Sequence, residues 1–397
     1  MKKPSLRTLN PAKFLKAGPN REARIMATEA KPLPKLNEYH ANKIAMALHP
    51  KKQVVKVVNI VERAVGVKSY TLKATTDTPV AYFSAGQYLV VNLQIGSYLL
   101  TRPYSISSSP KQAQVDNEYE LTVKRVDGGL ASNYILDNWT IGTEVTISAP
   151  AGHFTYEPLR DAKTVVGLAG GSGITPFVSL AKAIADGDED ASLVLLYGCA
   201  TKNDILFKNE LDALAKDCEK IKVVYVLSND KLDGAEEGFL SAELIKKYAP
   251  EGDYSVFVCG PQAMYNYLDT QLPLLGLRQK FIRHELFGEY HNPQANEDYP
   301  KDVNKNVKIT VVCRGDATTI DADTNDTILV SIEKAGIPAP ARCRSGSCGW
   351  CRAKLTSGNV YTPKNVDERK LADYDYGYIH PCCSFPLSDI TIEIFKK

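Results

Sequence analysis

The chain has 397 residues, of which 44% are hydrophobic and 24% are charged. This length exceeds what one hydrophobic core usually fills and predicts two to three domains, and no apolar run approaches the roughly 20 residues that a membrane span needs. The net charge is only +2, but residues 1–52 carry twelve Lys and Arg against three acids, so the remainder of the chain is acidic. We treat residues 1–50 as a basic N-terminal extension, a solvated tail to which we assign no role.

The N-terminus and the cysteine content indicate the compartment. The first residues, MKKPSLRTLNPAKFLKAG, lack the continuous apolar segment of a secretory signal, so we expect a cytoplasmic protein. Nine cysteines are an odd number, and four of them are spaced like ligands of a metal cluster. The cysteines therefore favour metal ligation over a disulfide framework.

Residues 51–157 have the pattern of an antiparallel β-barrel. Short runs of alternating hydrophobicity, including QVVKVVNIVE, KSYTLKATT, QYLVVNLQI and YELTVKRV, are separated by Gly, Asp and Pro turns. Such runs are typical of barrels and sandwiches built from short strands. We expect GTEVTISAPAGHF to end this domain.

Residues 158–289 change to apolar strands that alternate with longer amphipathic segments. TVVGLAGG, SLVLLYG, KVVYVLS and YSVFVCG predict buried parallel strands, and FVSLAKAIADG, LFKNELDALAKD, SAELIKKYA and AMYNYLDTQL predict the helices between them. This order predicts a doubly wound α/β domain with a parallel sheet.

Residues 290–305 are polar and contain proline, which is typical of an exposed linker between domains. A third domain is expected over residues 306–397. In it, VKITVVC and DTILVSIEKAGI predict a strand pair that enters a short helix, a cysteine-rich loop follows, and SDITIEIF predicts a final strand.

The cysteine-rich loop is the most specific signal in the sequence. In ARCRSGSCGWCRAKL, Cys343, Cys348 and Cys351 have the spacing C-x4-C-x2-C, and Cys382 follows in GYIHPCCSFP. This is the spacing of a plant-type 2Fe-2S ferredoxin, in which four thiolates hold two irons. A zinc site is the alternative, but zinc ribbons usually have paired C-x2-C knuckles. Because Cys382 and Cys383 are adjacent, either can be the fourth ligand, and the ferredoxin pattern favours Cys382.

With this loop at its C-terminus, the chain resembles reductases of the oxygenase-reductase type (the phthalate and phenylacetate type) in the ferredoxin-NADP reductase superfamily. The resemblance covers roughly residues 52–397. It implies a flavin-binding β-barrel over 51–157, a nicotinamide-binding domain over 158–289 and an α+β, β-grasp ferredoxin domain over 306–397.

Two segments of the barrel resemble the flavin site of that superfamily. TRPYSISSSP is similar to its R-x-Y-S motif, which implies that Arg102 pairs with a flavin phosphate, with Pro103 beside it, that Tyr104 packs on the flavin ring and that Ser105 lies near flavin N5. VKRVDGGLASNYI is similar to its phosphate loop, where a turn opens a short helix. The residues that match the loop are Gly129, Leu130, Ala131 and Ser132. FAD is the expected flavin, and FMN is the alternative.

The nicotinamide domain carries a glycine-rich turn between a strand and a helix, GLAGGSGITPF, which lets backbone amides approach a pyrophosphate. It is similar to the G-G-x-G-x-T-P of the superfamily, which implies that Thr175 lies near the nicotinamide and the flavin. The matching residues are Gly170, Gly171, Gly173, Thr175 and Pro176.

The end of this domain carries two further resemblances. VFVCGPQAMYNYL has the C-G-P-x-x-M pattern, which implies Cys259 beside the hydride path, with Gly260, Pro261 and Met264 in the cofactor site; an inert packed thiol is the alternative. RHELFGEY is similar to an E-x-F element that lies against the flavin, which implies roles for Glu285 and Phe287. A surface Glu and a core Phe would explain this weaker match nearly as well.

The coenzyme is NADH or NADPH. VLSND places Ser228, Asn229 and Asp230 where NADPH-selective relatives often carry a Ser-Arg pair, and no arginine is there. An acidic side chain repels a 2'-phosphate and accepts a bond from a free ribose hydroxyl, so NADH is favoured. Lys202 is nearby in sequence and leaves the choice open.

The resemblance implies an NAD(P)H-dependent iron-sulfur flavoprotein reductase, an electron-transport enzyme. Hydride passes from the nicotinamide to the flavin, and single electrons pass through the 2Fe-2S cluster to an external acceptor, an oxygenase component or another redox protein. Ser105, Thr175, Cys259 and Glu285 are the expected catalytic residues. No nucleic acid partner and no membrane insertion are expected. The alternatives are a non-catalytic electron-wiring subunit of a larger complex and a self-contained flavin or ferric reductase.

Overall fold

The computed structural model describes residues 23–24, 27, 39–76, 78–285 and 288–395. It divides into two units, Met1–Leu48 and His49–Lys397. In the first unit, helix α2 (His40–Leu48) exposes Ile44 and Met46 to solvent. Among the described residues, no helix is both long and apolar enough to cross a membrane. Most of the basic extension lies outside the described residues.

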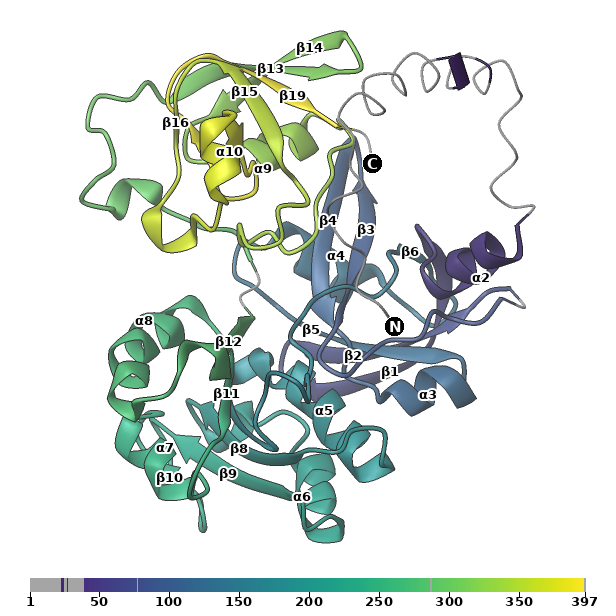
Figure 1. Cartoon of the computed structure of the whole chain (residues 1–397), viewed down its shortest axis with the longest axis vertical. Coiled ribbons are helices and arrows are strands. Elements are labelled where there is room, and N and C mark those ends of the chain that lie inside the picture. Colours follow the sequence, from purple (N-terminus) through teal and green to yellow (C-terminus); the bar gives the residue numbers. More distant parts are fainter. Residues whose placement is uncertain (1–22, 25–26, 28–38, 77, 286–287, 396–397) are drawn as a thin grey trace, which may run out of the picture. The chain divides into compact units, whose positions relative to one another are not determined.

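The second unit begins with an antiparallel sheet of six strands in the order β4-β3-β6-β1-β2-β5 (Figure 1). Alternate side chains such as Tyr70, Leu72, Leu89 and Val91 fill its core, as the alternating sequence predicts. A bridge between Ile106, just beyond β4, and a β5 residue joins the two edge strands and closes the barrel. The strands are β1 (Gln53–Ala64), β2 (Val67–Ala74), β3 (Tyr88–Ile95), β4 (Tyr98–Ser105), β5 (Glu118–Lys124) and β6 (Glu144–Ile147).

Two helices interrupt the barrel strands. Helix α3 (Pro110–Val115) begins at Ser109, whose hydroxyl accepts from the Gln112 N–H at 3.2 Å. Helix α4 (Leu130–Asn138) lies between β5 and β6 and packs Ile135 into the barrel core. The second helix therefore has a fixed place beside the strands.

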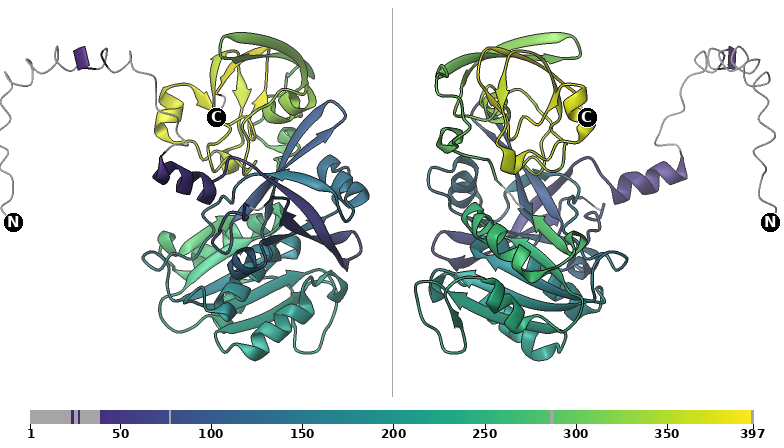
Figure 2. Two further views of the ribbon diagram at one scale, coloured as in Figure 1. Left: turned by 90° about the vertical axis from the view of Figure 1, so that its right-hand side faces the viewer. Right: turned by 60° about the vertical axis from the view of Figure 1, so that its left-hand side comes forward.

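The next sheet is parallel throughout, in the order β10-β9-β8-β7-β11-β12. Neighbouring strand residues face opposite sides: Val165 packs in the core with α5 and α6, and Val166 packs in the core with α7 and α8. Figure 2 shows helices on both faces, so the doubly wound fold is confirmed. The elements are β7 (Thr164–Gly170), α5 (Thr175–Asp186), β8 (Ser192–Cys199), α6 (Lys208–Asp217), β9 (Ile221–Leu227), β10 (Glu236–Glu237), α7 (Ala242–Tyr248), β11 (Ser255–Cys259), α8 (Gln262–Gln271) and β12 (Ile282–Glu285).

The strand order of the parallel sheet reverses at β7. Strands β8, β9 and β10 extend to one side of β7, and β11 and β12 lie on the other. In sheets of this kind, ligands bind beyond the carboxyl ends of the strands where the order reverses. Here those ends lead into the glycine-rich turn and the Cys259 segment.

The C-terminal domain is built on a mixed sheet in the order β14-β13-β19-β15-β17 with α9 packed against it. One detail differs from the sequence prediction: the second strand of the first hairpin is β14, whereas DTILVSIEKAGI forms α9 after a Thr327 cap. The sequence DATTIDAD of β14 is largely exposed, and this obscured the strand. The elements are β13 (Asn306–Cys313), β14 (Asp316–Asp323), α9 (Ile328–Lys334), β15 (Ala353–Ser357), β16 (Val360–Tyr361), α10 (Leu371–Asp375), β17 (Tyr378–Ile379), β18 (Phe385–Pro386) and β19 (Ile390–Ile394).

The segment before this domain, residues 290–305, is mostly exposed, but two of its tyrosines pack on the C-terminal domain. Tyr299 is buried, and its ring meets that of Tyr361 edge-on at a centroid distance of 5.1 Å. Tyr290 packs in the same way on Phe385, at 6.3 Å. The exposure of most of its residues agrees with the polar composition, and Tyr290 and Tyr299 attach the segment to the C-terminal domain.

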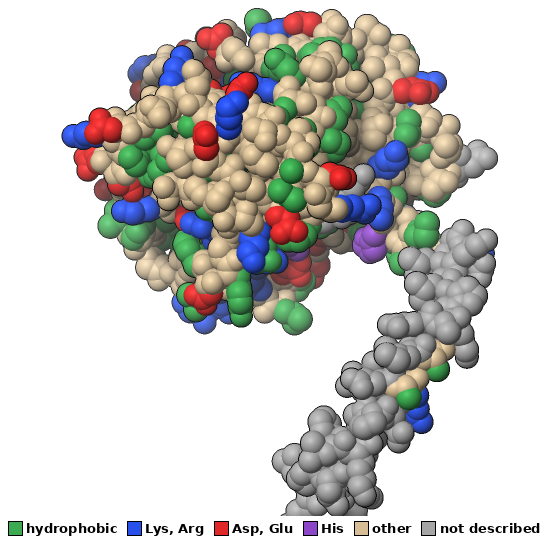
Figure 3. Space-filling view, turned by 90° about the horizontal axis from the view of Figure 1, so that it is seen from above, with side chains coloured by type: hydrophobic (Ala, Val, Ile, Leu, Met, Phe, Trp, Pro, Cys, Tyr) green, Lys and Arg blue, Asp and Glu red, His purple; other side chains and the backbone are tan. Residues whose placement is uncertain are grey.

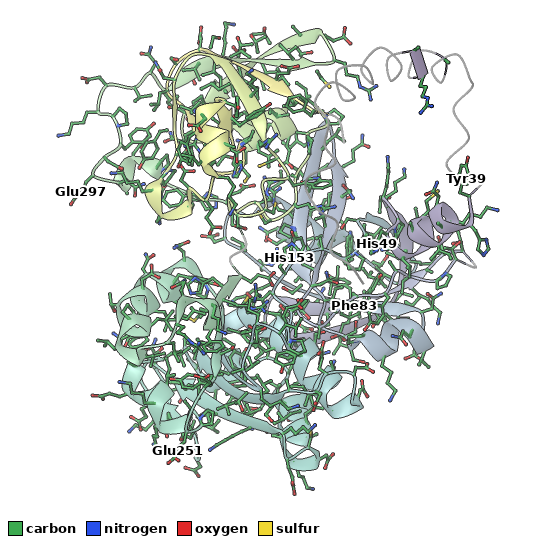
Figure 4. The ribbon with its side chains drawn as sticks, in the orientation of Figure 1. Tyr39, His49, Phe83, His153, Glu251 and Glu297 are labelled. Atoms are coloured by element: carbon green, nitrogen blue, oxygen red, sulfur yellow. The ribbon has the colours of Figure 1, made fainter. Side chains whose placement is uncertain are left out.

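Buried polar contacts join the barrel to the parallel-sheet domain. Arg283 of β12 donates through Nε to Asp161 Oδ1 at 3.0 Å and through Nη1 to the carbonyl of Thr155 at 2.7 Å. Its Nη1 also donates to the carbonyl of His153, which is labelled in Figure 4 where the side chains of the two domains meet. These bonds fix the end of the barrel on the last strand of the neighbouring sheet.

Candidate functional site

The four cysteines of the ferredoxin pattern lie together. The sulfur atoms of Cys351 and Cys382 are 3.4 Å apart, and the backbone N–H of Cys348 donates to the Cys343 sulfur at 3.4 Å. Cys343, Cys351 and Cys382 are buried, whereas Cys348 is exposed. Among the described residues, no group of three or more His, Cys, Asp or Glu is arranged to hold a single metal ion. The convergence of four sulfurs and of N–H donors is the donor set that a 2Fe-2S cluster requires.

The two adjacent cysteines have different hydrogen-bond partners. Cys382 faces Cys351, whereas Cys383 donates through its thiol to the carbonyl of His380 at 3.5 Å. Gly346 of the cluster loop has a φ of +87°, and a side chain there would overlap the carbonyl of Val366. The loop therefore needs glycine at this position to turn between its first two cysteines.

The flavin motif lies on β4, beside Tyr88 of β3. Tyr88 pairs with Ser105 and Leu89 pairs with Tyr104 in the antiparallel register. Pro103 and Ser105 are buried, and burial raises the pKa of Tyr104 well above its usual value. The strand thus holds an aromatic ring and a hydroxyl at fixed positions.

The phosphate loop caps α4 as the sequence predicts. Gly129 is the N-cap, and no side chain accepts from the first turn of the helix, so its N–H groups are available to an anion. A side chain at Gly129 would come within 2.8 Å of the Ser132 hydroxyl, which accounts for the glycine. Ala131 and Ser132 are buried, and Leu130 is partly exposed. This arrangement fits a flavin phosphate.

Arg102 has acidic neighbours that the sequence did not reveal. Its guanidinium forms ion pairs with Glu289 and Glu333, each at 3.2 Å, and donates to the carbonyl of Thr101 at 2.8 Å. The expected phosphate ligand therefore also contacts the C-terminal domain.

The two glycine-containing turns of the parallel-sheet domain pack on each other. A side chain at Gly173 would overlap the carbonyl of Cys259, and side chains at Gly170 or Gly260 would collide with Met264. Residues Gly171–Ile174 form a 3-10 turn that leads into α5, where Pro176 is in the first turn. The Thr175 hydroxyl donates to the carbonyl of Ser172 at 3.2 Å. Pro261, the N-cap of α8, is exposed beside this junction. The side-chain-free backbone at this junction fits the approach of a dinucleotide pyrophosphate.

Cys259 and Glu285 lie opposite each other at the ends of β11 and β12. Burial raises the pKa of both groups well above their usual values; the Glu285 charge adds to the effect at Cys259, and the Cys343 charge adds to it at Glu285. The Glu285 Oε2 atom is buried and has no hydrogen-bond partner. An unpaired buried carboxylate oxygen is costly unless a ligand or a proton satisfies it. Phe287 lies outside the described residues.

A cavity of about 280 Å³ joins the three domains. It brings together Tyr88 of the barrel, Glu285 of the parallel sheet and two cluster cysteines, Cys343 and Cys348. The space is thus bounded by the candidate flavin strand, the candidate nicotinamide domain and the cluster loop. Its other lining residues are Gly152, His153, Phe154, Arg160, Arg283, His284 and Ser347.

Comparison with known proteins follows the same division of the chain. An oxidoreductase FAD-binding domain matches residues 54–156, an oxidoreductase NAD-binding domain matches 168–270 and a 2Fe-2S iron-sulfur cluster binding domain matches 311–387. The ferredoxin reductase component of 3-ketosteroid-9-alpha-monooxygenase from Mycobacterium tuberculosis is 31% identical over 314 residues, which are 77% of this chain and 84% of that protein.

The chain belongs to the oxygenase-reductase family of the ferredoxin-NADP reductase superfamily. This reductase is an NAD(P)H oxidoreductase with FAD, nicotinamide and 2Fe-2S domains. The glycine betaine monooxygenase reductase subunit of Pseudomonas aeruginosa is 26% identical over 86% of this chain and 95% of that subunit. The crystal structure of a phthalate dioxygenase reductase matches with a TM-score of 0.63 and 25% identity, over 87% of this chain and 98% of the other.

Several residues around the cavity were missed by the sequence analysis. Tyr88 follows Gly86 and Gln87 at the start of β3, and only its pairing with Ser105 places it in the site. Arg283 and Arg344 look like ordinary charged residues in the sequence, yet both are buried. A buried arginine leaves no local pattern when its partners are distant in sequence. Those of Arg283 lie more than a hundred residues away. Those of Arg344 lie 243 residues away for Thr101, 55 for Glu289 and 11 for Glu333.

Proposed function

We propose that this reductase oxidises NADH at bound FAD and passes the electrons singly through a 2Fe-2S cluster to a separate oxygenase component. The cavity that Tyr88, Glu285, Cys343 and Cys348 line carries this proposal, because it connects the flavin strand, the nicotinamide domain and the cluster loop. FAD, when bound, accepts two electrons with the hydride, and the cluster takes electrons one at a time.

In the barrel, we assign Tyr104 to the flavin ring and Ser105 to the atom that receives hydride. We assign the flavin phosphate to the amides of Leu130, Ala131 and Ser132, because the Gly129 N–H donates to the Val126 carbonyl at 2.9 Å and Arg102 is ion-paired with Glu289 and Glu333. The pairing of this strand with Tyr88 and the free first turn of α4 support these roles.

In the parallel-sheet domain, we assign Thr175, Cys259 and Glu285 to the nicotinamide end of the dinucleotide site. There they exclude water and orient the nicotinamide carbon that donates the hydride. The glycine turns bind the pyrophosphate. The reversal of strand order at β7 and the close packing of Gly173 on Cys259 support this placement.

The cluster ligands that we propose are Cys343, Cys348, Cys351 and Cys382. Contacts among their sulfur atoms and neighbouring N–H groups support this set, as does the bond that the Cys383 thiol donates to the His380 carbonyl. We further propose the domain limits 51–157, 158–289 and 306–397, with residues 290–305 as the connection.

The coenzyme that we propose is NADH. The Asp230 carboxylate, at the end of β9, accepts from the backbone N–H of Lys202 at 3.2 Å and of Lys231 at 2.8 Å. These two bonds hold the pKa of Asp230 below its usual value, so the side chain is charged at neutral pH. A fixed negative charge there favours a ribose hydroxyl over a 2'-phosphate.

The acceptor that we propose is an oxygenase component, because the relatives include reductase subunits of monooxygenases and a phthalate dioxygenase reductase. Acidic and basic side chains are interspersed on the face shown in Figure 3. We also propose a cytoplasmic location, which cell fractionation would test.

An anaerobic titration of the full-length protein, loaded with FAD and cluster, tests the function. NADH is expected to bleach the flavin absorbance and then to produce the low-temperature EPR signal of a reduced 2Fe-2S cluster, whereas NADPH should do so only at higher concentration. Failure of both nucleotides to bleach the flavin would contradict the proposal. A Cys348→Ser variant separates the steps, because it should retain flavin bleaching and lose the EPR signal.

A further inference from the structure

The residue that follows the first cluster cysteine is a completely buried arginine. The side chain of Arg344 is 0% exposed, and its backbone has a φ of +62°, in the left-handed region that few residues other than glycine adopt. Its neighbour on the other side of Cys343, Arg342, is half-buried, and its guanidinium lies 3.4 Å from the ring centre of Trp350. The two arginines that flank one cluster ligand thus have different surroundings.

The partners of Arg344 come from all three domains. Its guanidinium donates to Glu333 of α9 at 2.8 and 3.0 Å, to the carbonyl of Thr101 on β4 at 3.1 Å and to Glu289, which follows the parallel sheet. Arg102 forms ion pairs with the same two glutamates. Two arginines and two glutamates therefore form one buried network without net charge.

The barrel strand also bonds to this network through its backbone. Thr101 donates to Glu333 Oε1 through its N–H at 3.1 Å and through its hydroxyl at 3.0 Å. A planar guanidinium and a carboxylate make several bonds of fixed direction, so their geometry is specific. An unpaired charge in the interior is costly. Both terminal nitrogens of the Arg344 guanidinium are bonded, whereas its buried Nε has no hydrogen-bond partner among the described residues.

The network connects one cluster ligand directly to the flavin strand. Arg344 is bonded in sequence to Cys343, and Thr101 precedes Tyr104 by three residues on β4. We infer that Arg344 is a positioning residue that holds the cluster loop against β4 and so fixes the separation between the flavin and the cluster. This inference rests on the proposed transfer of electrons from flavin to cluster.

A role confined to the C-terminal domain would require only the pair of Arg344 and Glu333, which both belong to it. Thr101 and Glu289 lie outside that domain and have no part in its own core. Their contacts with Arg344 distinguish docking from internal stability, and Glu289, with 13% of its side chain exposed, is suited to substitution.

The test uses the full-length protein loaded with FAD and cluster. We would compare wild type with three variants. Arg344→Lys keeps the charge and loses the planar guanidinium with its several N–H donors, and Glu289→Gln leaves the C-terminal domain unchanged. Arg342→Lys is the matched control. Anaerobic stopped-flow mixing with NADH separates the rate of flavin reduction from that of cluster reduction. Hydrogen exchange of residues 98–105 and 343–349 reports docking independently of turnover, and iron analysis reports cluster content.

The expected result is that Arg344→Lys and Glu289→Gln keep full iron content and wild-type flavin reduction, while cluster reduction slows about tenfold to 100-fold, in line with the effect of displacing reacting groups by about 1 Å. Exchange should rise in both peptides, and Arg342→Lys should behave as wild type. Wild-type cluster reduction in both variants would overturn the inference, and so would slowing that is matched by loss of iron. A wild-type flavin that NADH does not reduce would instead overturn the proposed function.

Discussion

Cys382 and Cys383 are adjacent buried thiols with different surroundings, and they provide a matched pair of substitutions. Cys382→Ser is expected to lose the cluster, because the Cys382 sulfur lies beside that of Cys351. Cys383→Ser should keep the cluster, because the Cys383 thiol donates to the carbonyl of His380. Iron and sulfide analysis with EPR of the reduced protein checks this prediction. Both variants should retain FAD. Loss of the cluster from Cys383→Ser alone would reverse the assignment.

Asp230 provides a prediction for coenzyme choice. Asp230→Ser removes a charge held by two backbone N–H groups and leaves Lys202, whose Nζ lies 3.9 Å from the carboxylate, free to meet a 2'-phosphate. We expect kcat/KM for NADPH to rise about tenfold, equivalent to about 1.4 kcal/mol. Steady-state assays with an artificial electron acceptor measure it. Asp233→Ser, an exposed acid in the same loop, is the control, and an unchanged NADPH/NADH ratio for Asp230→Ser would contradict the prediction.

At this scale the sequence motifs located some of the residues that the fold brings together, since Glu285, Cys343 and Cys348 line one cavity. The sequence could not reveal what surrounds them. Arg102 was assigned to phosphate from its motif, but its pairing with Glu289 and Glu333 depends on the packing of three domains. Burial and partners of this kind are tertiary properties, and no local spacing encodes them.

Among the elements, the turn between β7 and α5 depends on its packing against the end of β11. Gly173→Ala would force a methyl group into the carbonyl of Cys259. Backbone must then move, so we expect NADH affinity to fall at least tenfold, or about 1.4 kcal/mol, while FAD stays bound. Gly198→Ala on β8 is the control, because a methyl group there meets its neighbours at 3.5 Å or more. Equal NADH affinities of the two variants, measured by anaerobic titration, would contradict this packing argument.

Helix α6 contributes a pH-dependent contact to the barrel. Burial raises the pKa of Glu210, but Lys182 of α5 and Arg63 of β1 outweigh it and hold the pKa below the usual 4.5. Because the folded pKa is the lower one, the contact stabilises the protein above about pH 4.5 and is lost as the pH falls through the folded value. We expect Glu210→Gln to lower the Tm at pH 7 and to have little effect below the folded pKa.

Calorimetry of the FAD-loaded protein across this pH range measures the effect of Glu210. Asp217→Asn, at an exposed position of the same helix, should leave the pH dependence as in wild type. A Glu210→Gln difference that is constant with pH would show that the ion pairs contribute nothing to stability.

The strands and helices of the parallel-sheet domain were predictable because the period of hydrophobic residues in the sequence agrees with the side chains that the fold buries. The expected strand TVVGLAGG is observed as β7 (Thr164–Gly170), and the four expected helices are observed as α5 to α8. The elements that escaped prediction, such as β14 and α10, are short or polar and form only because neighbouring elements pair with them or cover them.

Across the whole molecule, the flavin barrel comes first in the chain but stands between the other two domains in the proposed reaction, and it contacts both of them. The nicotinamide domain is fixed to the barrel by the bonds that Arg283 donates to the carbonyls of His153 and Thr155. The C-terminal domain is bound to the barrel by Arg344 and its partners. This arrangement was predictable as a sequence of domains, but the contacts between them were not.

The packed connection before the C-terminal domain has a consequence for how electrons leave the molecule. Tyr290 and Tyr299 pack on that domain, so the connecting segment is attached to the domain that binds the cluster. We therefore expect the C-terminal domain to stay in place during electron transfer. Electron delivery by movement of the whole cluster domain would need a long flexible linker, which this segment is not. We therefore expect the oxygenase to dock where Cys348 is exposed at the surface. The turnover of the two proteins together then depends on how often they associate.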